Sequence, residues 1–172
     1  MDILTLKEHN NLIKYKSDIM SQLISSTDLA SLCKNDMTIT EEQIEELIWN
    51  NYIPMLFVDG TITNTEAYIM FDIDTRSNRI TTFDDITLYF QIYCHKDIIK
   101  AYKRQCTRID AIISELMNLF DEKTTLGIGY NIRIADEILN TTNPNYVGRQ
   151  LTFKVSDFAE RSKIRGKKKN QY

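Results

Sequence analysis

The alternation of apolar and polar residues predicts two long strands in the middle of the chain. Residues 67–74 alternate along most of their length, and residues 84–95 alternate more cleanly. A period of two is typical of a sheet that packs one face on a core and leaves the other partly in water. The polar stretch between the two strands contains no two-residue turn, so a longer loop is expected there. In the second strand the inward-facing positions are Ile86, Leu88, Phe90, Ile92 and Cys94.

Helical spacing of apolar residues predicts helices on both sides of these strands. Residues 10–25 carry one apolar stripe, which a Ser-Ser-Thr-Asp stretch breaks before a short second helix at 28–34. Thr40 and Gln43 have the spacing of a capping box, which indicates a helical turn after Thr40. The longest stripe runs through residues 97–121 and predicts one long helix.

Two further strands are expected after the long helix. Residues 127–135 and 150–157 both alternate, and turn-forming residues separate them. The order α-α-β-β-α-β-β predicts an α+β fold with a four-stranded, mostly antiparallel sheet that helices cover on one face. The apolar positions of the first of these two strands are Ile128, Tyr130, Ile132 and Ile134.

Charge divides the 172-residue chain into an acidic body and a basic end. Residues 1–160 carry 15 of the 21 basic residues and all 24 acidic residues, a net charge of −9. We therefore expect one α+β domain at 1–159, helical in 1–51, and a basic, flexible tail at 160–172. The tail is a candidate contact for nucleic acid or for protein, and simple solvation is the alternative. Its basic residues are Arg161, Lys163, Arg165, Lys167, Lys168 and Lys169.

The three cysteines do not form a recognisable chemical motif. None of Cys33, Cys94 and Cys106 belongs to a CxxC pair. Cys94 and His95 are neighbours on a predicted strand, so their side chains point to opposite faces. A zinc site needs about four convergent ligands, and the only other histidine is His9. Free thiols, no metal site and no Cys–His nucleophile are expected.

Other signatures of catalysis are missing from the sequence. It contains no GxSxG, HExxH, P-loop or GxGxxG pattern. Asp72 and Asp74 share one strand face, as the carboxylates of a magnesium-dependent nuclease do. The next strand, however, lacks a lysine two residues after an acidic residue, so solvated carboxylates are the preferred interpretation. We expect no enzyme activity, no cofactor and, without an apolar run of 18 residues, no membrane span.

The outer face of the predicted sheet is the candidate protein-contact surface. Tyr89 and Tyr93 would lie there beside polar residues, and aromatic residues are enriched at interfaces. Cross-strand pairing on a wetted face is the alternative. Arg76 and Arg79, in the loop region 75–82, and the basic residues of the tail complete the set of candidate contacts.

Four segments of the second half carry a resemblance to a known family. They are AYIMFDID, ITLYFQIYCH, RIDAIISELMNLF and GRQLTFKVSDF, in that order. Over residues 53–158 this succession resembles the head–tail connector proteins of tailed bacteriophages, in particular the tail-completion or tail-terminator group. The Gly148-Arg149 pair and the helix around Asp110 are the closest to signatures.

The resemblance implies a structural virion protein of the phage neck. Such proteins assemble as a ring, commonly of six copies, that completes or terminates the tail and joins it to the head. The implied partners are the tail-tube protein on one side and a head connector or stopper protein on the other. DNA would pass through without sequence-specific binding, which suits an acidic body. The protein would be made in the bacterial cytoplasm and reside at the head–tail junction. The alternative is a nucleic-acid-binding accessory protein that uses the basic tail.

Overall fold

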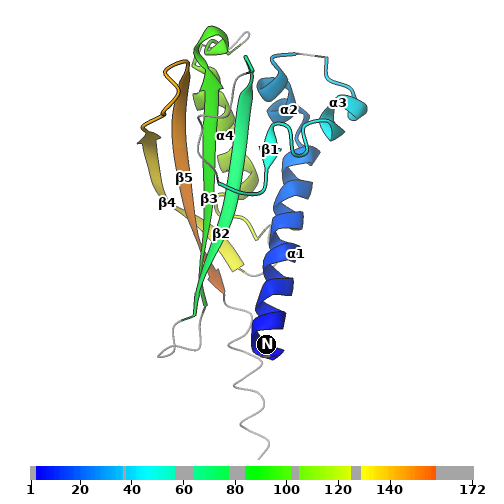
Figure 1. Cartoon of the computed structure of the whole chain (residues 1–172), viewed down its shortest axis with the longest axis vertical. Coiled ribbons are helices and arrows are strands. Elements are labelled where there is room, and N and C mark those ends of the chain that lie inside the picture. Colours follow the sequence, from blue (N-terminus) through cyan, green and yellow to red (C-terminus); the bar gives the residue numbers. More distant parts are fainter. Residues whose placement is uncertain are drawn as a thin grey trace, which may run out of the picture.

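The computed structural model describes most of the chain and shows a sheet flanked by helices (Figure 1). The described residues are 3–36, 38–56, 64–77, 84–101, 105–124 and 129–157. The tail at 160–172 and the loop residues 78–83 lie outside them. Within the described residues no helix is long and apolar enough to cross a membrane.

The sheet has five strands in the order β1-β2-β3-β5-β4. The α+β class is confirmed, but the predicted number of four strands is wrong. The additional strand, β1, has only two residues and pairs in parallel with β2, which makes the sheet mixed. All other neighbours are antiparallel. The strands are β1 (Tyr52–Ile53), β2 (Ala67–Ser77), β3 (Asp84–His95), β4 (Gly129–Leu139) and β5 (Tyr146–Asp157).

The helices begin at residues that can cap them. Thr40 and Gln43 form the predicted capping box, with each side chain bonded to the backbone of the other residue. Ser26 caps the second helix by accepting from the Leu29 amide at 3.2 Å. The helices are α1 (Ile3–Ser25), α2 (Thr27–Lys34), α3 (Glu41–Glu45) and α4 (Arg108–Phe120), with a 3-10 turn, η2, at Lys96–Ile98.

The long helix predicted at 97–121 is wrong in its first half. After η2 the chain leaves helical geometry, and α4 starts only at Arg108, with Thr107 as its cap. The buried Arg108 side chain donates to the carbonyls of Ile98 at 2.6 Å and Lys100 at 3.1 Å. Those carbonyls are therefore bound by a side chain, and the segment turns instead of continuing the helix.

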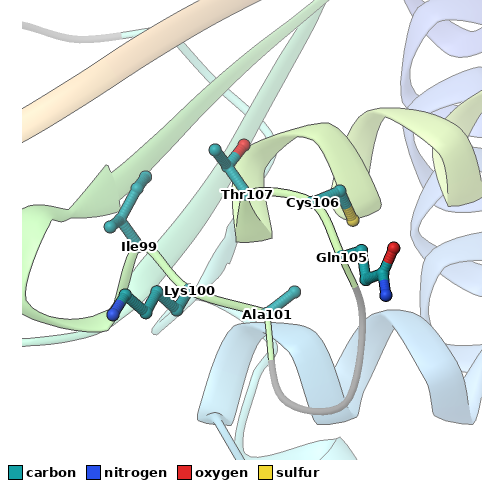
Figure 2. A pocket seen from close by; sticks show the side chains of 6 residues that line it. All are labelled: Ile99, Lys100, Ala101, Gln105, Cys106 and Thr107. Atoms are coloured by element: carbon teal, nitrogen blue, oxygen red, sulfur yellow. The ribbon is translucent and has the colours of Figure 1, made fainter.

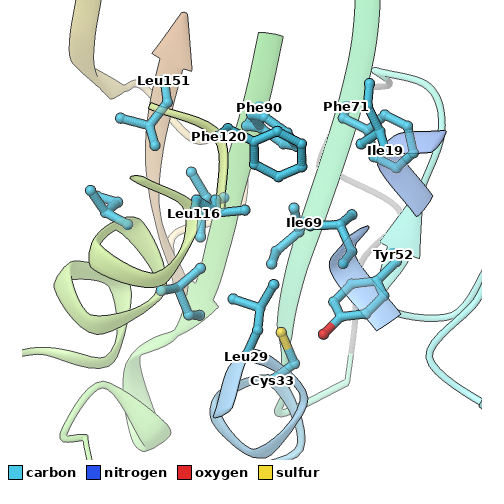
Figure 3. Close-up of a cluster of buried hydrophobic side chains, with 14 of the residues drawn as sticks. Ile19, Leu29, Cys33, Tyr52, Ile69, Phe71, Phe90, Leu116, Phe120 and Leu151 are labelled. Atoms are coloured by element: carbon cyan, nitrogen blue, oxygen red, sulfur yellow. The ribbon is translucent and has the colours of Figure 1, made fainter. Parts of the chain in front are cut away.

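One apolar core joins the helices to one face of the sheet. α1, α2 and α4 contribute Ile19, Leu29 and Leu116, and all three are fully buried (Figure 3). Phe90 of β3 lies at the centre, with its ring centroid 4.9 Å from that of Phe120. Burying one such side chain stabilises the fold by roughly 1.5–3 kcal/mol, so this cluster supplies most of the cohesion between the layers.

Candidate functional site

The opposite face of the sheet carries a second, smaller apolar cluster. It consists of Ile53, Tyr68, Met70, Tyr93 and Tyr146, all buried. The Tyr93 hydroxyl donates to Gln91 Oε1 at 3.2 Å. The expectation that Tyr93 is exposed is therefore wrong, because Tyr68, Met70 and Tyr146 pack around it.

The remaining predicted contact residues divide into two groups. Tyr89 is half-buried on the expected face of the sheet, opposite the helices. Its partners on the neighbouring strands are Asp72 of β2 and Thr152 of β5. The backbone of Arg76 belongs to β2, but its side chain lies outside the described part of the chain. The other predicted contacts also lie outside the described residues: Arg79, Arg161, Lys163, Arg165, Lys167, Lys168 and Lys169.

The cysteines do not come together. Cys33 and Cys94 are buried in the core, and burial raises the pKa of Cys33 to about 12 and that of Cys94 to about 11. Cys106 is exposed just before α4, although the helix predicted at 97–121 would have included it. Among the described residues no three His, Cys, Asp or Glu side chains gather as metal ligands.

Of the two aspartates Asp72 and Asp74, the first is engaged in contacts within the fold. Asp72 forms an ion pair with Lys16 of α1, with 2.7 Å between Nζ and Oδ1. Its Oδ1 also accepts from the Ile73 amide at 2.8 Å. An ammonium group in this position neutralises the carboxylate that a nuclease would need for its cation.

A pocket of about 420 Å³ lies where η2 leads toward α4 (Figure 2). Lys100 supplies its only cationic side chain among the described lining residues, and Thr107 is engaged as the helix cap. The described lining includes no histidine or carboxylate that could serve as a general base beside Cys106. The lining residues are Ile99, Lys100, Ala101, Gln105, Cys106 and Thr107.

The most unusual surface of the described chain is the outer side of β4. The sheet order leaves β4 at one end, paired with β5 alone. Ile132, Ile134 and Ile138 are 52%, 57% and 79% exposed. Alternation predicted Ile132 and Ile134 as apolar positions of this strand, and the structure leaves both of them exposed. Ile132 pairs with Lys154, and a bulge between Arg133 and Ala135 shifts the register at Ile134.

The first half of this outer side is protected and the second half is not. The segment after α4 bonds to it, with Glu122 donating to the Asn131 carbonyl at 2.8 Å and Asn131 donating to Lys123 at 2.9 Å. Asp121 also accepts from the Arg133 amide at 3.1 Å. In the described structure residues 134–139 have no strand beside them there, and we call them the free β4 edge.

The opposite edge of the sheet is covered. β1 pairs with Ile69 and Met70 of β2, and α1 lies alongside β2 beyond it (Figure 1). This covered side still exposes three large apolar residues, Ile13, Trp49 and Met55, at 68%, 65% and 48%. We call it the α1–β1 side. Neither the exposure of these three residues nor the free β4 edge was anticipated from the sequence, because periodicity gave no indication of which strand is outermost.

Fold and surface together define a small α+β sheet domain with one covered and one partly free sheet edge. The family model YomW matches residues 8–155, so the chain belongs to the YomW family. YomW is the name of a phage-derived protein, and the match supports a phage origin. No curated protein and no solved structure matches the chain.

Proposed function

We propose that this chain is a structural virion protein of the phage neck. In this role it forms a ring that completes or terminates the tail and joins it to the head connector. The phage-derived family and the order of elements from β2 to β5 support the proposal. The partners would be further copies of the chain, the tail-tube protein and a connector or stopper protein.

The observation that carries the proposal is the free β4 edge. An unpaired strand edge with exposed isoleucines is a template for association, and monomeric proteins usually cover or charge such edges. This chain covers its other edge with β1 and α1, and it covers the start of β4 with residues 121–123. In the part of the chain that the structure describes, residues 134–139 have no strand beside them on this side, as a surface that is buried in an assembly would.

The electrostatics of the body agree with a conduit for DNA. Residues 1–160 have a net charge of −9, so a ring of several copies would repel the phosphate backbone rather than hold it. α3 contributes to this charge with exposed Glu41, Glu42 and Glu45, and Glu46 follows directly. DNA that passes through the ring would therefore meet walls of like charge.

Labelling of phage particles tests the proposed role. An antibody against this chain should decorate purified virions only where the head meets the tail. The same particles stripped of tails would show which side of the junction retains the label. If intact virions lack the chain, the structural role is wrong. Salt-sensitive DNA binding that disappears on deletion of 160–172 would then favour the nucleic-acid-binding alternative.

A further inference from the structure

Trp49, on the α1–β1 side, is an exposed aromatic residue that the fold holds in an uncommon conformation. Its indole is 65% exposed, and its backbone has φ 65°, which bulky residues rarely adopt. The Trp49 amide donates to the Tyr52 carbonyl at 2.9 Å. The Leu47 carbonyl accepts from three amides of the same turn, those of Asn50, Asn51 and Tyr52. Backbone bonds therefore fix the turn that presents the indole to the outside.

The short helix that leads to Trp49 is strongly acidic. Residues 35–51 contain five acidic residues and no lysine or arginine. α3 and the residue after it present four exposed glutamates, and within the described part of the chain none of them is in an ion pair. Like charges four positions apart destabilise a helix, and they occur here twice. A cation bound beside them would relieve this repulsion. The four residues are Glu41, Glu42, Glu45 and Glu46.

The indole and the end of α3 form one surface. Asn50, next to Trp49, donates from its side chain to the Glu46 carbonyl at 2.6 Å. α3 lies at the margin of the molecule, beyond α2 and β1 (Figure 1). A lysine or arginine side chain can place its charge over an indole ring and donate to carboxylates. We call Glu45, Glu46 and Trp49 the α3–Trp49 surface, and its chemistry fits a basic segment.

The chain itself contains a segment of this kind. Residues 158–172 carry six basic residues and one acidic residue, Glu160, a net charge of +5. Ile164 lies among the basic residues and adds an apolar side chain that can pack against the indole. Opposite charge and the combination of cationic and apolar side chains make residues 161–169 the occupant that this surface suits.

This segment begins at the opposite end of the sheet from the α3–Trp49 surface. Val155, near the end of β5, lies in one row with Thr75 of β2, with β3 between them. Tyr52, three residues after Trp49, pairs with Ile69 of β2. Six residues of β2 separate these two rows, which corresponds to ~20 Å along the strand. Figure 1 shows the same separation between the end of β5 and α3.

The length of the segment favours binding to another copy of the chain. An extended chain advances by at most ~3.4 Å per residue, so Lys163 lies within ~20 Å of Asp157. Its own Trp49 is farther away, because β3 and β2 also lie between β5 and β1. The first basic residues of the segment therefore fall short within one copy. A second copy can bring its α3–Trp49 surface next to the end of β5, and all six basic residues can then take part.

We infer that the basic segment 161–169 of one copy binds the α3–Trp49 surface of the next copy. Its lysine and arginine side chains stack on the indole of Trp49 and pair with the carboxylates of Glu45 and Glu46. This inference rests on the proposed assembly of several copies and names one contact within it.

Binding of the segment in trans tests this contact on the full chain. The chain is made with its six basic end residues changed to glutamine, so that its own segment no longer competes. A peptide of residues 158–172 should then shift the emission of Trp49, the only tryptophan, to shorter wavelength. Salt at about 1 M, where the Debye length is roughly 3 Å, should abolish the shift. The changes are Arg161→Gln, Lys163→Gln, Arg165→Gln, Lys167→Gln, Lys168→Gln and Lys169→Gln.

Substitutions on the surface locate the binding site. Glu45→Gln combined with Glu46→Gln should weaken binding of the peptide about fivefold, since two ion pairs are lost. Glu122→Gln combined with Glu137→Gln is the matched control, because it removes the same charge from two exposed positions at β4 and the segment before it. The control should bind the peptide as the parent surface does. Equal weakening in both would mean general attraction to an acidic body, and it would overturn the inference.

The remaining outcomes separate this contact from the proposed function. In the parent chain, dilution should move the Trp49 emission to longer wavelength as copies separate. Emission that is the same at every dilution would overturn the contact between copies. A peptide that binds duplex DNA and not the protein would overturn it in favour of nucleic acid. An oligomer that forms without peptide binding would remove this contact and leave the ring intact, whereas a chain that stays monomeric would contradict both.

Discussion

The ammonium group of Lys16 lies 2.7 Å from the carboxylate of Asp72 and joins α1 to the outer side of β2. Lys16 Nζ also donates to the Pro54 carbonyl at 2.9 Å, so one side chain connects α1, β2 and the segment after β1. The covered edge of the sheet depends on this junction. Because that edge is covered, sheet pairing by a second copy is left to β4.

Replacement of Lys16 by methionine should loosen this junction without unfolding the domain. Both partners are partly exposed, so we expect a loss of about 1 kcal/mol in the free energy of unfolding. Amide hydrogen exchange should become faster in α1 and in β2 near Asp72, and stay unchanged in β4. Lys14→Met is the matched control, because the Lys14–Asp18 pair at 3.7 Å lies within α1. Equal exchange in the two variants would refute the role given to Lys16.

Arg108 should be the most sensitive single position outside the apolar core. It is 2% exposed, and besides Ile98 and Lys100 it donates to the Leu32 carbonyl at 2.8 Å and to the Asn35 side chain. Arg108→Met would leave several buried acceptors unpaired and should lower the free energy of unfolding by about 3 kcal/mol or more. Urea denaturation measures this loss.

The exposed Arg133 is the control for that experiment. Arg133→Met should change the free energy of unfolding by no more than about 0.5 kcal/mol, as is usual at surface positions. If Arg108→Met lowers the free energy of unfolding no more than Arg133→Met does, the guanidinium of Arg108 does not hold the segment between η2 and α4.

Gly148 should not tolerate even a methyl group. A Cβ at this position would lie 2.9 Å from Leu139 Cβ and 3.1 Å from Thr141 Cγ2, closer than side-chain carbons normally approach. Gly148→Ala should therefore force β4 and β5 apart and cost about 1–3 kcal/mol, and Gly148→Val should cost more. Thermal unfolding of the two variants measures whether Gly148→Val loses more stability than Gly148→Ala. A Gly148→Ala protein as stable as the parent would mean that the two strands shift freely.

Stability should fall at alkaline pH because of the buried thiol of Cys33. Burial raises its pKa from 9.0 to about 12, so between these values the unfolded chain loses a proton that the folded chain retains. The free energy of unfolding then decreases as pH rises above 9.0, by up to about 1.4 kcal/mol per pH unit for this group. Urea denaturation at about pH 8 and about pH 10 should show a smaller decrease for Cys33→Ala than for the parent. Equal decreases would remove Cys33 as the cause.

Elements with an unbroken local pattern could be predicted well from the sequence. The period-two alternation of residues 84–95 gave β3 with both its ends, because this central strand has its apolar positions on the core face. The capping box of Thr40 and Gln43 was equally predictable, since it depends only on residues three apart. The α+β class followed from the order of such elements.

Features fixed by contacts distant in sequence could not be predicted. β1 is two residues long, too short for any period, and exists only because β2 pairs with it. Arg108 ends the expected helix through bonds to carbonyls that a sequence pattern does not reveal. Tyr93 becomes buried because Tyr68 and Tyr146 pack around it. The exposure of Ile138 follows from strand order, which alternation does not contain.

Native mass spectrometry of the full chain over a dilution series tests the assembly of this protein most directly. We predict one closed oligomer with a single copy number, and we predict that Ile138→Asp shifts it to monomer while circular dichroism stays unchanged. A parent chain that is monomeric throughout, or that forms an open series of sizes without a preferred copy number, would contradict the ring.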